Sequence, residues 1–142
     1  MNNNEIIIRP FEESDRKALQ NVLKKEASYT VKHNGGGSEK KKECLCYMYS
    51  DYYFDYEPQN VLVAVHKGTP CGFILGSTDY KLFVSKMKEI YVPKILKNSK
   101  LWGLFHKICV AVNKKQDKKG GVAFHINIDQ NYQGKKIGTR LM

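Results

Sequence analysis

Runs of apolar residues, separated by short polar stretches that contain glycine or proline, predict an alternating series of strands and helices. Residues 5–9 form a β-branched run and predict a first strand. Apolar residues at helical spacing over about 15–30 predict a first helix, with Ser14 as its N-cap and Asp15 in its first turn. A second helix is expected over about 41–56.

The middle of the chain predicts an antiparallel hairpin followed by a helical insert. The apolar runs 61–65 and 71–76 are joined by a turn-forming Lys-Gly-Thr-Pro sequence, which favours a hairpin. Helical spacing predicts one inserted helix that ends at Pro93 and another over about 101–112. The second has an apolar stripe made of Leu101, Leu104, Phe105, Ile108 and Val112. Such an insert would cover a substrate site or form a subunit contact, and the sequence leaves both open.

The end of the chain predicts a strand, a glycine-containing loop and the first turns of a helix. Alternation defines the strand: one side carries Phe124, Ile126 and Ile128, and the other carries His125, Asn127 and Asp129. The loop contains Gly134 and Gly138, and glycine tolerates positive φ and close approach of the backbone. Three cations lie beside the N–H groups of the helix start, namely Lys135, Lys136 and Arg140. These features predict a site for a phosphate-bearing ligand.

The chain is strongly basic, because 24 Lys and Arg residues against 14 Asp and Glu give a formal net charge of +10. Such a charge suits a nucleic acid, an anionic cofactor such as a nucleotide, or plain solubility. The lysines are spread along the chain and are not interleaved with stacking aromatic residues in one patch. We therefore rank nucleic acid last among these partners.

The cysteines and the apolar runs indicate where the protein acts. The four cysteines have neither a disulfide-framework spacing nor the spacing of zinc ligands, so we expect free thiols, no metal site and a cytoplasmic location. No apolar run is long enough to span a membrane and no signal peptide is visible, so we expect no membrane partner.

The expected second helix is unusually aromatic, with Tyr47, Tyr49, Tyr52, Tyr53, Phe54 and Tyr56. These residues could form a wall for an acceptor substrate, because tyrosine combines apolar contact with a hydroxyl. Alternatively, the helix packs on a sheet with its hydroxyls reaching water. We favour the second interpretation.

The order of elements and three local matches resemble one known family. Residues 7–15 look like the first strand and the start of the first helix, and residues 63–76 look like the hairpin. Gln133, Lys136 and Gly138 correspond to the pyrophosphate motif Gln/Arg-x-x-Gly-x-Gly/Ala. The chain thus resembles the N-terminal two-thirds of GNAT-type acyltransferases, which transfer an acyl group from acyl-coenzyme A to an amine. This resemblance implies an α+β fold, mainly an antiparallel sheet flanked by helices, with the helical insert between strands three and four.

A narrower similarity and the position of Met142 add to this picture. Residues 52–58, 78–80 and 125–134 are similar to a bacterial branch of acetyltransferases that resembles the acetyltransferase-like domain of O-GlcNAc hydrolases. In the family, a fifth strand, a further helix and a last hairpin follow the pyrophosphate motif. We therefore expect residues 1–142 to form a single, partial domain without those elements.

Carried over by position, the resemblance implies a site for acetyl-coenzyme A (acetyl-CoA). Backbone amides would hold the pyrophosphate, Thr139 would add a hydroxyl, and Ile126 and Ile128 would offer main-chain groups to the pantetheine arm. The cofactor-binding residues expected are Ile126, Ile128, Gln133, Gly134, Lys135, Lys136, Ile137, Gly138 and Thr139. The middle glycine of the motif is Lys136 here, and its side chain would either crowd the pyrophosphate or contact it.

The implied chemistry is direct attack of an amine on the thioester, for which a base must take the amine proton. His125 and Asp129 are the candidate catalytic residues, and Glu57 and Glu89 are weaker alternatives. Asp129 could equally be a turn acceptor, and His125 a partly buried strand residue. Where some relatives carry a catalytic glutamate, this chain has Val122.

Two functions remain in view. The first is an N-acetyltransferase that moves an acetyl group from acetyl-CoA to a primary amine of a small molecule or peptide. The second is a non-catalytic half-domain that acts as a binding or dimerisation module. The fourth strand should have an open edge. A second copy could pair with that edge or with the insert to form a homodimer, or the insert could fold over the edge.

Overall fold

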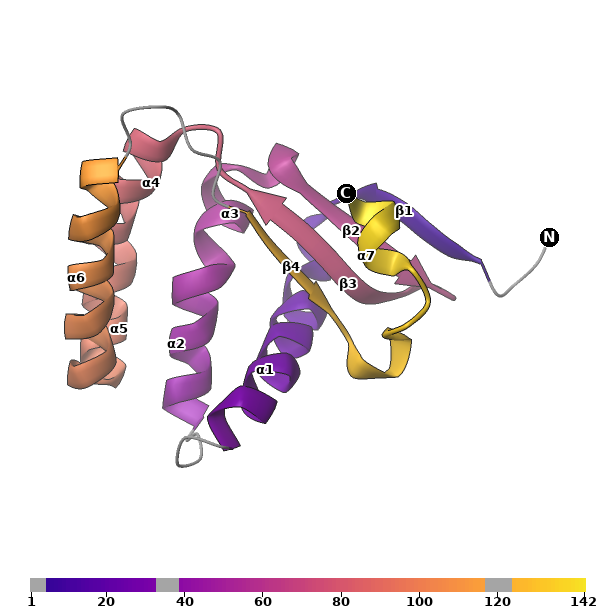
Figure 1. The fold of residues 1–142 in the computed structure, drawn as a ribbon, viewed down its shortest axis with the longest axis horizontal. Coiled ribbons are helices and arrows are strands. Elements are labelled where there is room, and N and C mark those ends of the chain that lie inside the picture. Colours follow the sequence, from indigo (N-terminus) through magenta and orange to yellow (C-terminus); the bar gives the residue numbers. More distant parts are fainter. Residues whose placement is uncertain (1–4, 33–38, 117–123) are drawn as a thin grey trace.

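A four-stranded antiparallel sheet, in the order β1-β2-β3-β4, lies at the centre of the fold (Figure 1). The structure is a computed structural model that describes residues 5–32, 39–116 and 124–142. The strands are β1 (Ile6–Pro10), β2 (Val61–His66), β3 (Thr69–Gly76) and β4 (Phe124–Ile128). Helices flank this sheet, so the predicted α+β class is confirmed.

Helices and helical turns connect the strands. They are η1 (Glu13–Asp15), α1 (Arg16–Lys32), α2 (Glu39–Tyr49), α3 (Asp51–Tyr56), η2 (Pro58–Asn60), α4 (Tyr80–Lys86), η3 (Met87–Tyr91), α5 (Val92–Asn98), α6 (Lys100–Gln116), η4 (Gln130–Tyr132) and α7 (Ile137–Leu141). Within the described ranges, no helix has the length and apolar character needed to cross a bilayer. Val122 lies outside the described residues.

The predicted hairpin of β2 and β3 is confirmed, and its turn explains the register. Lys67 and Gly68 both have positive φ, of 50° and 77°. Two successive positive φ angles define the turn that matches the right-handed twist of the flanking strands. The pairing shifts once, between Ala64 and Val65, where the strands adjust by a bulge.

The start of α1 differs from the prediction, because Ser14 is not its N-cap. The short turn η1 precedes the helix, and the backbone N–H of Glu12 donates to the Asp15 carboxylate at 2.9 Å. Arg9 donates to both oxygens of the same carboxylate, at 2.7 and 2.8 Å. These bonds from Arg9 hold the pKa of Asp15 below its usual range. A partly buried ion pair thus ties β1 to the turn before α1.

The predicted helix over 41–56 is two helices, α2 and α3, with a break at Ser50. The backbone of Ser50 leaves helical geometry (φ −135°), and its carbonyl accepts bonds from the N–H groups of Tyr53 and Phe54. Tyr52 and Tyr53 are fully buried, and Phe54 packs in the same cluster. Burial of these rings supports the packing interpretation and leaves them unable to line an acceptor wall. The Tyr52 hydroxyl does not reach water, so that part of the interpretation is wrong for this residue.

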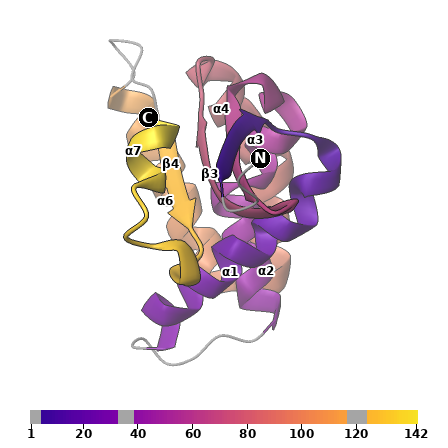
Figure 2. The same ribbon diagram turned by 90° about the vertical axis from the view of Figure 1, so that its right-hand side faces the viewer.

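Both faces of the sheet are covered. On one face, Val61, Val63 and Phe73 form the main core with residues of α1 and α3. On the other face, Ala64 packs against Ile137 and its neighbours in α7. Figures 1 and 2 show α1 and α2 on one side of the sheet and α7 on the other.

The first inserted helix does not end at Pro93. A helical run continues from Tyr80 to Asn98 through the π-helical turn η3, in which the N–H of Val92 reaches the carbonyl of Met87. Pro93 cannot donate a backbone hydrogen bond, and the wider turn just before it relieves the clash that a proline makes inside a regular helix. The sequence therefore marked an irregularity in this helix and not its end.

The second inserted helix, α6, carries the predicted apolar stripe on its exposed side. Leu101, Leu104, Phe105 and Ile108 of that stripe are exposed, while Gly103, His106 and Val110 are buried. Gly103 causes this orientation, because a Cβ placed there would lie 2.5 Å from the Leu96 side chain. The glycine face of α6 can therefore approach α5 closely. The pair packs on α2 through a cluster that includes Cys44, Met48 and Ile95.

β4 is an edge strand, as the sequence predicted, since β3 is its one neighbour among the described strands. The inserted helices do not fold over this edge. Figure 1 places α5 and α6 beyond α2, at the far end of the molecule from α7. Pairing with a second copy through this edge stays a prediction.

Candidate functional site

The edge strand β4 presents main-chain groups to its open side. The N–H of Asp129 donates to the carbonyl of Cys71 at 2.8 Å, which identifies that pair as hydrogen-bonded. Bonded and non-bonded pairs alternate along an antiparallel ladder. With the observed register, Asn127 bonds β3, whereas the N–H and C=O groups of Ile126 and Ile128 point away from the sheet. These are the two positions expected to meet an extended ligand arm.

The loop that follows β4 is anchored at several points. Asp129 accepts a bond from the N–H of Asn131 at 3.0 Å and lies 3.7 Å from the Lys25 ammonium. Tyr132 reaches back to the hairpin, where its hydroxyl lies 3.2 Å from Nδ1 of His66. Asp129 is therefore a turn acceptor, the structural role that the sequence left open for it. Whether it also takes part in chemistry stays a prediction.

Lys136 has a backbone conformation that favours glycine. Its φ of 57° and ψ of 22° lie in the left-handed region, directly before α7. A residue other than glycine pays about 1–2 kcal/mol for this conformation. Its side chain is exposed, as is that of Lys135, whose ammonium lies 5.1 Å from the Tyr132 ring centroid. Lys136 therefore keeps the left-handed turn of the loop, and its side chain lies in solvent.

The same segment carries a run of unpaired N–H groups. Within residues 124–142, the N–H groups of Gly134, Lys135 and Lys136 have no hydrogen-bond partner. The first hydrogen bond of α7 runs from the N–H of Arg140 to the carbonyl of Lys136. The N–H groups of Ile137, Gly138 and Thr139 are therefore also without a hydrogen-bond partner. α7 has only five described residues, so its dipole adds little. The anion-binding capacity comes from successive amides and the cations Lys135, Lys136 and Arg140.

α7 sits close against β4. A Cβ placed at Gly138 would lie 3.5 Å from Ile128 Cδ1 and 3.7 Å from Ile126 Cδ1, which is ordinary contact. Ile137, the first residue of α7, is buried. Thr139 is exposed beside it. The amide run therefore lies at the end of the open strand edge.

Gln133 links this loop to α1. Its side-chain amide donates to Glu26 Oε2 at 3.1 Å and to the carbonyl of Ile128 at 3.4 Å. The second bond reaches an outward-pointing carbonyl of β4. Gln133 thus joins the strand edge, the loop and a carboxylate from a distant part of the sequence.

Glu26 is a functional candidate that sequence reasoning missed. Burial raises the pKa of its carboxyl above the ordinary value, and the nearby charge of Asp129 raises it further. Its Oε1 is buried without a hydrogen-bond partner among the described residues. A signal existed, because Glu26 continues the helical spacing of Leu19, Val22 and Leu23. A carboxylate on the core-facing stripe of a helix requires a reason.

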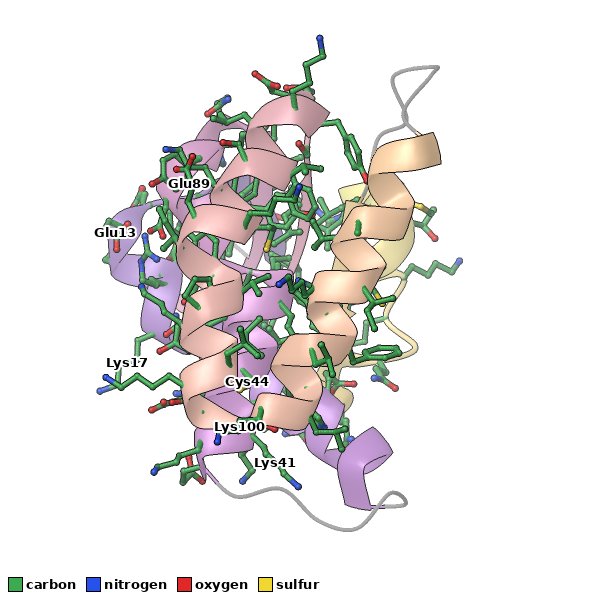
Figure 3. All side chains as sticks on the ribbon, turned by 90° about the vertical axis from the view of Figure 1, so that its left-hand side faces the viewer. Glu13, Lys17, Lys41, Cys44, Glu89 and Lys100 are labelled. Atoms are coloured by element: carbon green, nitrogen blue, oxygen red, sulfur yellow. The ribbon has the colours of Figure 1, made fainter. Side chains whose placement is uncertain are left out.

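The other sequence candidates lie elsewhere or outside the description. The backbone of His125 pairs with Leu75 in the sheet, but its side chain is outside the described part of the structure. Glu57 is buried and accepts bonds from Thr78 and Asp79, so it anchors the β3–α4 connection. Glu89 is exposed on η3 and bonds Ser85. Figure 3 shows Glu89 on the side of the insert, away from α7.

No protein-family model and no curated protein matches the sequence. Solved structures nevertheless share its fold. A structure described as SsHAT has a TM-score of 0.74 at 19% identity, over 96% of this chain and 73% of that one. A polyamine N-acetyltransferase of Drosophila melanogaster, which forms N-acetylagmatine, has a TM-score of 0.59 at 19% identity, over 97% and 67%.

Two further neighbours have the same architecture. An agmatine N-acetyltransferase has a TM-score of 0.61 at 20% identity, over 98% of this chain and 67% of that one. A mosquito arylalkylamine N-acetyltransferase-like protein has a TM-score of 0.55 at 17% identity, over 96% and 67%. These matches show a GNAT-type fold for this chain. The narrower bacterial branch stays a prediction.

Proposed function

We propose, from the GNAT-type fold of this chain, that it is an N-acetyltransferase that moves an acetyl group from acetyl-CoA to a primary amine. The observation that carries the proposal is the run of unpaired N–H groups from Gly134 to Thr139. Three cations flank this run, and it begins where the open edge of β4 ends. Such a run suits a ligand with an anionic end and an extended, amide-containing arm.

The residues present fit the coenzyme in two respects. Lys135, Lys136 and Arg140 are exposed cations beside free amides, which is the donor set that phosphate groups require. The outward N–H and C=O groups of Ile126 and Ile128 match the amides of a pantetheine arm as an added strand would. When bound, acetyl-CoA supplies the thioester carbonyl that the amine attacks.

Glu26 is our candidate for the proton acceptor. Its raised pKa brings the carboxylate closer to the working range of a general base, and its unpartnered Oε1 is free to accept a proton. Asp129 raises that pKa through its charge and is therefore proposed as a positioning and tuning residue. His125 remains a second candidate from the sequence.

The acceptor is proposed as a small or peptide amine. The fold neighbours named for polyamine, agmatine and arylalkylamine substrates suggest the first compounds to assay. The alternative, a non-catalytic half-domain, predicts that none of these amines is acetylated.

The test measures release of free coenzyme A when the protein is supplied with acetyl-CoA and agmatine, a polyamine or an arylalkylamine. The double variant Lys135→Gln/Lys136→Gln should raise KM for acetyl-CoA about tenfold, because it removes two charges beside the amide run. The matched control Lys81→Gln removes an exposed charge on α4 and should leave KM unchanged. No turnover with any amine, or an equal effect of both variants, would overturn the proposal.

A further inference from the structure

The outer side of α6 carries a large exposed apolar surface. Four side chains form it, and we call them the α6 apolar face: Leu101 (76% exposed), Leu104 (55%), Phe105 (63%) and Ile108 (54%). They follow one another at the three- and four-residue spacing of a single helix face. An exposed apolar surface of this kind marks an interaction site in a folded protein.

This face is not turned toward any described part of the chain. Gly103, His106 and Val110 hold the opposite side of α6 against its neighbours, so the apolar face looks outward. Figure 1 places α5 and α6 at one end of the molecule's longest axis. Figure 3 shows the two helices side by side at that end, with Lys100 near their connection. The face can therefore lie along a flat surface without obstruction from the sheet.

The charged residues that α5 and α6 themselves carry are of one sign. The sequence from residue 90 to residue 116 contains no Asp or Glu and has six lysines: Lys94, Lys97, Lys100, Lys107, Lys114 and Lys115. Lys97, Lys100 and Lys107 are exposed, and none of them belongs to an ion pair among the described residues. A partner of this surface should consequently be both apolar and negatively charged.

The order of residues places the charges beside the apolar face and not across it. At 100° per residue, Lys100 and Lys107 fall within 20° of each other, along one border of the face. This arrangement is typical of helices that lie in the interfacial plane of a membrane, with apolar side chains inserted and lysines at the headgroups.

We propose that α6 is a docking surface for an anionic lipid bilayer, with the α6 apolar face inserted at the level of the headgroups. A second copy of the chain fits less well, because pairing two α6 faces would bring lysines together with no carboxylate on α5 or α6 to meet them. The proposal departs from the sequence-based expectation of no membrane partner. That expectation rested on the lack of a spanning segment, which a helix lying on a surface does not need.

The chain contains its own reporter for this event. Its single tryptophan, Trp102, lies in α6 next to Leu101, partly buried, with the Lys41 ammonium 6.0 Å from its ring centroid. Insertion of the neighbouring side chains into a bilayer would move Trp102 to a drier environment. Its fluorescence emission should then shift to shorter wavelength.

The experiment mixes the 142-residue chain with vesicles of phosphatidylcholine alone or with about 30% phosphatidylserine, and records Trp102 emission and sedimentation with the vesicles. We expect at least about tenfold stronger partitioning into the anionic vesicles, together with the emission shift. Each of Lys100→Gln and Lys107→Gln should weaken binding about fivefold.

Replacement of exposed apolar residues separates insertion from simple charge attraction. Leu104→Gln/Phe105→Gln should abolish the emission shift without unfolding the protein, since both side chains are exposed. Ile7→Gln, at an equally exposed apolar position on β1, is the matched control and should bind as the wild type does. Equal binding to both vesicle types, or no binding, would overturn the proposal. A lipid-independent dimer that Leu104→Gln/Phe105→Gln dissolves would also do so, since the face would then join two copies.

Discussion

At the scale of single residues, Lys136 decides how far the pyrophosphate motif is kept. The family's motif has glycine at this position, and the expected reason is a backbone that needs positive φ. The structure places Lys136 in that conformation, with its side chain directed to solvent. The sequence left open whether the Lys136 side chain would crowd the pyrophosphate or contact it. Its direction into solvent does not support crowding. A contact between the ammonium and a phosphate remains our proposal.

Lys136→Gly should stabilise the protein and weaken its hold on acetyl-CoA. Glycine releases the strain of the left-handed conformation, but it also gains freedom in the unfolded chain, so the net gain should be on the order of 0.5 kcal/mol. Loss of the charge should weaken acetyl-CoA binding about fivefold. Urea denaturation and calorimetric titration measure the two effects. Lys135→Gly is the control, because Lys135 does not have a positive φ in the described segment 124–142. This change should lower both the free energy of unfolding and the affinity for acetyl-CoA.

Glu26→Gln should separate stability from activity. Its pKa is raised in the fold, so Glu26 contributes stability at low pH that is lost as pH rises through its folded pKa. The neutral amide avoids that loss, and we expect a gain on the order of 0.5 kcal/mol at pH 7. The rate of acetyl transfer should fall about 100-fold with KM for acetyl-CoA unchanged.

A pH profile gives the independent check on Glu26. The wild-type rate should rise with pH as the carboxyl loses its proton, and the Glu26→Gln variant should lack that rise. A variant that keeps the wild-type rate and profile would show that Glu26 is only a structural residue. His125 would then be the next residue to replace.

At the scale of elements, the sequence predicted best where local signals decide the structure. The hairpin of β2 and β3 followed from turn chemistry, and β4 followed from strict alternation, because both depend on neighbours in the chain. The break at Ser50 and the π-helical turn before Pro93 were not predicted as such. Each depends on how the helix packs against other elements, which periodicity does not report.

The orientation of α6 could not be predicted for a related reason. Helical spacing identified the stripe from Leu101 to Ile108 correctly, but apolar spacing alone does not distinguish a core face from an exposed docking face. The orientation of α6 depends on the close approach of Gly103 to Leu96, which is a contact between α6 and α5. A lone glycine on the other side of the stripe was the sequence signal for that contact.

Gly103→Ala should destabilise the protein by about 1–3 kcal/mol, although alanine is the better helix former. The added Cβ would lie 2.5 Å from Leu96 Cγ and 2.7 Å from its Cα, so α5 and α6 would have to separate. Gly138→Ala in α7 is the matched control, since its Cβ would make only ordinary contacts and should be tolerated. Thermal unfolding of both variants is the measurement. A stabilised Gly103→Ala protein would show that the two helices do not pack as described.

At the scale of the whole molecule, the candidate site joins elements that are far apart in the sequence. The proposed cofactor-binding segment could be named from the sequence, because its strand, loop and cations are contiguous between Ile126 and Arg140. The carboxylate at Glu26 was not, since only the fold brings the end of α1 to Gln133. The contact between Glu26 and Gln133 could not be predicted, because the two residues are far apart in the sequence.

The two proposed functions belong to different parts of the molecule. In Figure 1, α7 and the loop before it lie on the far side of β4 from α6, the helix that carries the α6 apolar face. A protein docked on a bilayer through α6 would therefore keep the candidate site accessible from solution. Variants at one end should leave the other unaffected, because changes at separated sites without shared partners act independently.

The central claim is that this chain holds acetyl-CoA on the amide run beside β4. Isothermal titration calorimetry of the 142-residue protein with acetyl-CoA tests it most directly. We predict one site with a dissociation constant between about 1 µM and 1 mM. Binding of acetyl-CoA should weaken as salt increases. The Lys135→Gln/Lys136→Gln variant should bind acetyl-CoA about tenfold more weakly than the wild type does. No binding up to millimolar acetyl-CoA, or binding that the double variant leaves unchanged, would contradict the claim.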